Sequence, residues 1–145
     1  MIDQVLVAAD KIQSRYRLVV LLAAFGSLRF AEMIGLRRQD LNLDACAVRI
    51  DRQAVQPDHS PMFEDDPKSA AGKRPITLPS LLRSEIRTHL DTYVKPDETA
   101  WVFLGPKGAR PKRNNFHAIW DKARKAAGIP DLHLHEGGAD LPPRA

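Results

Sequence analysis

Residues 28–36 read LRFAEMIGL, and residues 37–44 directly after them read RRQDLNLD. The apolar side chains of the first segment recur at helical spacing, which predicts a short helix from about Leu28 to Leu36. Arg29 and Glu32 are three residues apart on that helix and form a helical pair. Beyond residue 44 apolar and polar residues alternate, which predicts a half-buried strand over residues 45–52. The chain therefore passes from a short helix into a sheet.

Outward from this segment, the sequence predicts further helices on both sides of a small group of strands. Residues 16–25 are apolar on nearly every side and predict a buried helix. Pro75 predicts that its strand lies at an edge or leaves its N–H side unpaired. The remaining predicted helices cover residues 3–14, 81–94 and 115–127, and the remaining strands cover residues 62–63 and 74–78. This order of helices, then a small antiparallel β-sheet, then helices indicates an α+β fold that is mostly helical.

Length and composition limit the class of protein. The chain has 145 residues, which favours one domain, and a formal net charge of +4, which is compatible with nucleic acid but common elsewhere. The single Cys46 excludes an internal disulfide and a cysteine zinc site, and we expect no metal, because His133 and His135 lack a further ligand at a sensible spacing. The apolar runs are too short for a bilayer and no signal peptide is visible, so we expect no membrane and a cytoplasmic protein. Residues 136–145 predict an unstructured tail behind a domain of residues 1–135.

The segment from Leu28 to Asp44 resembles the first active-site box of the tyrosine recombinases, the phage-integrase family. In that box a small residue, a leucine and an arginine open a short helix, which reads Glu-Leu-x-x-Leu and leads to an Asp-Ile or Asp-Leu turn and a strand. The resemblance implies that Arg29 grips a phosphate, that the substrate is DNA, and that the fold is part of the family's catalytic domain.

A second segment, PKSAAGKRPITLP at residues 67–79, is similar to the family's β-hairpin box. In that box Lys-Thr or Lys-Ser is followed by a short turn, a basic residue and the start of a helix. The family's catalytic lysine corresponds to Lys68, because Lys68 and Ser69 occupy the Lys-Thr/Ser place. Lys73 is the second candidate, because the turn can slip by a few residues.

A third segment, NFHAIWDKARKAAGIP at residues 115–130, resembles the helix that precedes the family's second active-site box. That box begins Leu-x-x-His-Asp-Leu-Arg-His. His135 takes the place of its first histidine, with His133 as a competitor. The match then ends, because Gly138 stands where the second catalytic arginine belongs.

The chemistry that the resemblance implies needs a fuller set of residues. In the family, two arginines stabilise charge on the phosphate oxygens, a lysine protonates the departing 5′ oxygen, and a histidine assists. A tyrosine attacks the phosphorus and holds the DNA as a 3′-phosphotyrosine, without metal or cofactor. Tyr16 and Tyr93, the only tyrosines, read as core or boundary residues. We therefore expect a DNA-binding remnant of an integrase that cannot recombine DNA, with an incomplete catalytic set of Arg29, Lys68 and His135 facing one basic concave surface.

Six basic residues are candidates for binding double-stranded DNA, and they lie in the hairpin segment and around the loop before the last helix. They are Lys73, Arg74, Lys107, Arg110, Lys112 and Arg113. For these basic residues, the alternative to DNA binding is an ordinary solvated face. For the chain as a whole, the alternative function is a non-enzymatic basic DNA-binding or interaction module. We also expect self-association through an open apolar face, because the family's later helices normally cover it. The expected lining of that face is Leu18, Val19, Leu22, Trp101, Phe116 and Trp120.

Overall fold

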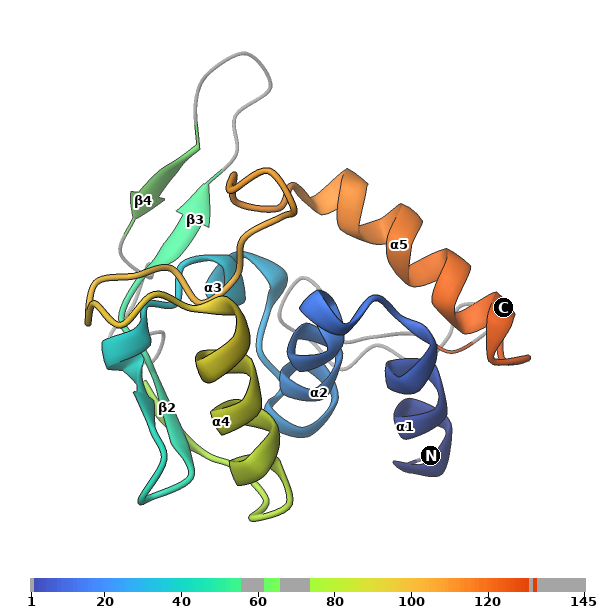
Figure 1. Cartoon of the computed structure of the whole chain (residues 1–145), viewed down its shortest axis with the longest axis horizontal. Coiled ribbons are helices and arrows are strands. Elements are labelled where there is room, and N and C mark those ends of the chain that lie inside the picture. The colour runs from blue at the N-terminus through green and yellow to red at the C-terminus, as the bar shows by residue number, and fades with distance from the viewer. Residues whose placement is uncertain (1, 56–61, 66–73, 131, 133–145) are drawn as a thin grey trace.

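The computed structural model describes residues 2–55, 62–65, 74–130 and 132 (Figure 1). Its α-helices are α1 (Ile2–Lys11), α2 (Arg17–Gly26), α3 (Phe30–Ile34), α4 (Leu82–Tyr93) and α5 (Arg113–Ala126), and its 3₁₀ helices are η1 (Ser14–Tyr16) and η2 (Arg38–Asp40). Its strands are β1 (Leu41–Asn42), β2 (Ala47–Ile50), β3 (Gln53–Val55), β4 (Phe63–Asp65) and β5 (Arg74–Thr77). The fold is α+β and mostly helical, as predicted.

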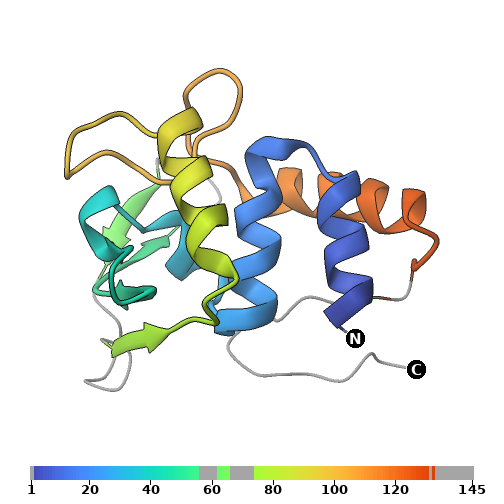
Figure 2. The ribbon, with the colours of Figure 1, turned by 60° about the horizontal axis from the view of Figure 1, so that its bottom comes forward.

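Helix α2 is the centre of the fold, because almost every side of it is apolar. Its residues from Leu18 to Ala23 are each at most 2% exposed. Figure 2 shows α2 between α1 and α4, and α5 packs against α1. The guanidinium of Arg17 joins three helices, since it donates to Asp10 at 2.5 Å and to the two carboxylate oxygens of Glu85 at 2.9 and 3.0 Å.

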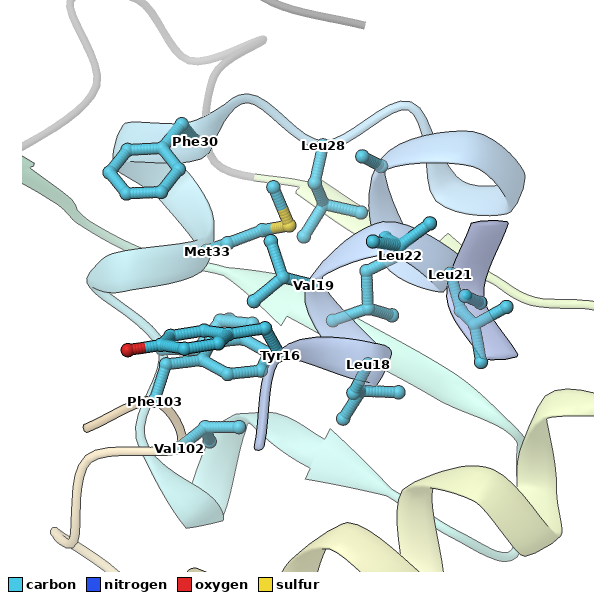
Figure 3. Close-up of a cluster of buried hydrophobic side chains, with 14 of the residues drawn as sticks. Tyr16, Leu18, Val19, Leu21, Leu22, Leu28, Phe30, Met33, Val102 and Phe103 are labelled. Carbon is cyan, nitrogen blue, oxygen red and sulfur yellow. The ribbon is translucent and has the colours of Figure 1, made fainter. Parts of the chain in front are cut away.

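The core closes around α2, and this corrects the expectation of an open apolar face. Five of the six residues expected to line that face are at most 5% exposed, namely Leu18, Val19, Leu22, Phe116 and Trp120. Figure 3 shows Tyr16, Phe30 and Phe103 packed in the cluster beside α2. The ring of Phe116, from α5, lies 5.5 Å from that of Phe30 and 6.0 Å from that of Tyr16 between centroids, so aromatic side chains seal this side. Self-association of the chain stays a prediction.

Two small antiparallel sheets carry the strands. One has the order β1-β2-β5, and the other pairs β3 with β4. Pro75 lies opposite Arg49 on the edge strand β5, which confirms its predicted edge position. The predicted alternation is also confirmed, since Cys46, Val48 and Ile50 are at most 2% exposed. Strand β4 overlaps the strand predicted at residues 62–63, whereas β3 was not predicted from the sequence.

His89 ties α4 to the segment that leads to α5. It is 4% exposed, and its Nε2 lies 2.7 Å from the carbonyl oxygen of Val102. Its ring also packs against Phe103 and Tyr93, at 5.1 and 5.3 Å between ring centroids. The sequence offered no signal for this contact, because a histidine on a helix is most often at the surface or only partly buried.

We expect acid to destabilise the fold through His89. Burial lowers its pKa below the ordinary 6.5, the hydrogen bond to Val102 opposes this, and the charge of Arg15 adds to the lowering. Because the unfolded chain then binds a proton more readily, the free energy of unfolding should fall as the pH decreases from about 6.5 through the folded pKa, and level off below it. Urea unfolding between roughly pH 5 and 7.5 measures this, and a His89→Gln variant should lose that part of the pH dependence. Identical pH dependence in both proteins would contradict the prediction.

Candidate nucleic-acid interface

Arg29 stands at the start of α3 with its side chain exposed. Helix α2 ends at Gly26, Ser27 turns the chain with a left-handed φ of 55°, and Leu28 is fully buried. Phe30 is buried again at 8% exposure, so the two apolar neighbours fix the backbone while the arginine faces water. Within the part of the chain that the structure describes, the guanidinium of Arg29 has no hydrogen-bond or ion-pair partner.

Glu32 supports the backbone beneath Arg29. It is 4% exposed, and its Oε1 accepts a hydrogen bond from the N–H of Arg29 at 2.9 Å. Its Oε2 accepts another from the guanidinium of Arg74, the first residue of β5, also at 2.9 Å. The expected helical pair is thus corrected: Glu32 binds the backbone of Arg29 and the side chain of Arg74. The guanidinium of Arg29 is not used to neutralise this carboxylate.

Asp40 repeats this arrangement further along the same segment. It is 5% exposed, and its Oδ2 accepts hydrogen bonds from the N–H of Arg37 at 2.8 Å and from Nη1 of Arg52 at 2.6 Å. The same Nη1 donates to the carbonyl of Gly35 at 3.0 Å. Both buried carboxylates were missed from the sequence. The available signal was the spacing Arg-x-x-Glu and Arg-x-x-Asp, because a carboxylate three residues into a turn can accept the N–H at its start, as in a capping box.

The basic loop before α5 forms a tight turn. The N–H of Gly105 donates to the carbonyl of Ala109 at 2.7 Å, and Gly108 has a φ of 84°. Three of the four candidate residues here are exposed, namely Lys107, Lys112 and Arg113. The fourth, Arg110, is half-buried, and its guanidinium carbon lies 4.2 Å from the centroid of the Trp101 ring.

A contact between Phe30 and Phe116 brings the starts of α3 and α5 together (Figure 1). Arg29 directly precedes Phe30, and Arg113 opens α5 in the same turn as Phe116. Arg29 and the basic turn therefore lie on neighbouring elements. The remaining predicted site residues, Lys68, Lys73 and His135, lie outside the described residues, as does the predicted tail 136–145, so their placement stays a prediction.

Among the described residues, no group of three or more His, Cys, Asp and Glu side chains is arranged to hold a metal ion. No helix in the same part of the chain has both the length and the apolar character needed to cross a bilayer.

The fold is that of the tyrosine recombinases. The crystal structure of XerA recombinase matches with a TM-score of 0.71 and 14% identity, over 93% of this chain and 44% of that chain. The Tn1549 transposon integrase, in complex with circular intermediate DNA, matches with a TM-score of 0.71 and 19% identity, over 96% of this chain and 45% of that chain. These likenesses define the class of protein by its fold.

The chain belongs to the phage integrase family, whose sequence profile matches residues 1–137. The putative prophage phiRv2 integrase of Mycobacterium tuberculosis (strain ATCC 25618 / H37Rv) is 35% identical over 125 residues, which are 83% of this chain and 32% of that protein. The integrase of Mycobacterium phage D29 is 29% identical over 134 residues, which are 90% of this chain and 36% of that protein. The chain thus spans about a third of the length of these relatives. The resemblance inferred from residues 28–44 is confirmed.

Proposed function

We propose that this chain binds double-stranded DNA as part of a phage-type integrase, in the cytoplasm, where the whole protein breaks and rejoins DNA for integration. The observation that carries the proposal is the exposed guanidinium of Arg29, which has no partner among the described residues. A guanidinium offers a planar fork of donors that suits a phosphate. The acid beside it, Glu32, is already paired with Arg74 and does not compete. The Tn1549 integrase, a structural neighbour with DNA bound, supports the proposal.

The exposed side chains of Lys107, Lys112 and Arg113 extend this site along the DNA backbone. Each lysine or arginine that neutralises a phosphate releases bound counterions, so affinity should depend steeply on salt. Arg74 has a different role in the described contacts, because its guanidinium holds the buried Glu32. We therefore place Arg29 and the basic turn, ahead of Arg74, in direct contact with phosphate.

We further propose that a chain of these 145 residues does not cleave DNA by itself. Tyr16 is 4% exposed, and burial raises its pKa, so it is a poor nucleophile. The hydroxyl of Tyr93 bonds Ser14, and the guanidinium carbon of Arg15 lies 5.0 Å from its ring centroid. Gly138 has no side chain to stabilise a phosphate, and losing one such donor costs on the order of a hundredfold in rate.

The test is DNA binding by an Arg29→Gln variant across a salt series. Fluorescence anisotropy with a labelled duplex should show several-fold weaker binding, and the slope of log affinity against log salt should become shallower by about 0.9. Arg87→Gln is the matched control, because Arg87 is an exposed arginine on α4 outside the proposed surface. It should bind like the wild type.

Two outcomes would overturn these proposals. Equal salt slopes for Arg29→Gln and the wild type would remove Arg29 from the interface. For the second proposal, the chain is mixed with a nicked suicide substrate and run on a denaturing gel. No covalent adduct is expected, and a phosphotyrosine at Tyr16 or Tyr93 would refute it.

A further inference from the structure

The ring of Trp101 contacts two arginine side chains that are far apart in the sequence. The guanidinium carbon of Arg37 is 4.6 Å from the centroid of its ring, and that of Arg110 is 4.2 Å away. All three side chains are half-buried. Such distances are typical of cation–π contacts, which are strongest with tryptophan.

The backbone around Trp101 is fixed to residues 36–38, which directly follow α3 and Gly35. Trp101 forms an antiparallel bridge with Arg37. On one side of it the N–H of Val102 donates to the carbonyl of Leu36 at 3.0 Å, and on the other the N–H of Arg38 donates to the carbonyl of Ala100 at 2.8 Å. The indole ring therefore stands at a defined place relative to α3.

The basic turn has less to hold it at its tip. Gly108 has open space where a side chain would begin, and Lys107 beside it is exposed. Arg110 lies between the tip of this turn and the start of α5, so its contact with Trp101 links the turn to residues 36–38, which follow α3. A stacked guanidinium uses its face for the ring and keeps the N–H groups along its edge for hydrogen bonds.

We propose that Trp101 is a positioning residue for DNA binding, which holds Arg110 and the basic turn of residues 105–113 beside Arg29. The inference rests on the proposed DNA-binding function. Trp101 does not need to contact DNA itself. Arg37, which lies just after α3, contacts the ring and holds it in place.

The first test compares Trp101→Leu, which keeps apolar volume without a π face, with Trp101→Phe, which keeps the face. Trp101→Leu should weaken duplex binding several-fold and make the salt slope shallower by about one, as Arg110→Gln should, while Trp101→Phe retains most of the affinity. Because Trp101 acts through Arg110, the double variant Trp101→Leu/Arg110→Gln should bind DNA no more weakly than Arg110→Gln alone. Tyr93→Leu, which removes a ring under Arg15 instead, is the control and should bind like the wild type.

The second test needs no DNA and separates this inference from the proposed function. Limited trypsin digestion should cut after Lys107 faster in Trp101→Leu and Arg110→Gln than in the wild type, Trp101→Phe or Tyr93→Leu, because an untethered turn opens more often. If the wild type is protected at Lys107 but does not bind DNA, the proposed DNA-binding function is wrong, and only the contact by which Trp101 holds the turn is supported. Equal cleavage in all variants, or additive losses of affinity in the double variant, would overturn the role of Trp101.

Discussion

Replacing Arg74 by alanine should lower the free energy of unfolding by about 3–5 kcal/mol, because it strands a buried charge. The side chain of Glu32 is 5% exposed, and Arg74 donates to its two oxygens at 2.9 and 3.3 Å. Without Arg74 the carboxylate keeps the N–H of Arg29 as its one partner among the described residues. Urea denaturation followed by circular dichroism measures the loss.

Arg49→Ala is the matched control, since Arg49 also forms an ion pair at 2.9 Å, with Asp51, but with side chains 64% and 32% exposed. Exposed pairs contribute about 0–1 kcal/mol. Adding Glu32→Leu to Arg74→Ala should restore much of the lost stability, because no charge is then left buried. An Arg74→Ala loss as small as that of Arg49→Ala would show that Glu32 does not need Arg74 to stay buried.

Replacing Phe103 by alanine should also lower the free energy of unfolding by about 3–5 kcal/mol. The cause in this case is the cavity that the missing ring leaves in the core. Phe103 is 1% exposed, and its ring packs 5.1 Å from that of His89. A domain of this size has a total stability of about 5–15 kcal/mol, so the variant should melt far below the wild type.

Phe63→Ala removes the same side chain at a position that is 47% exposed and is the control. It should change the free energy of unfolding by about 0.5 kcal/mol or less, since little packing is lost at the surface. Similar losses for the two variants would mean that Phe103 is not part of a close-packed core.

The sequence was most informative where a periodic pattern has a single physical explanation. A helix as apolar as residues 16–25 has to be central, and α2 is. The alternation ending at Ile50 required a strand with one buried face. The resemblance implied that Arg29 contacts a phosphate, and its side chain is exposed.

The sequence was least informative where a contact depends on how the chain returns on itself. Glu32 read as part of a polar helix face, because its partner Arg74 enters only when β5 is placed beside β2. Trp101 was expected only to line the apolar face, since nothing local indicates that Arg37 and Arg110 both contact its ring. The closed core could not be seen either, because ring contacts such as that of Phe30 with Phe116 depend on the crossing of distant helices.

The two buried carboxylates also limit how this protein can evolve. Changing Arg74 alone or Arg52 alone leaves Glu32 or Asp40 charged and unpaired, so each single substitution passes through a less stable protein. Paired substitutions avoid that intermediate. Among homologues, positions 32 and 74 should therefore change together, as should positions 40 and 52, whereas the exposed pair of Arg49 and Asp51 should vary independently.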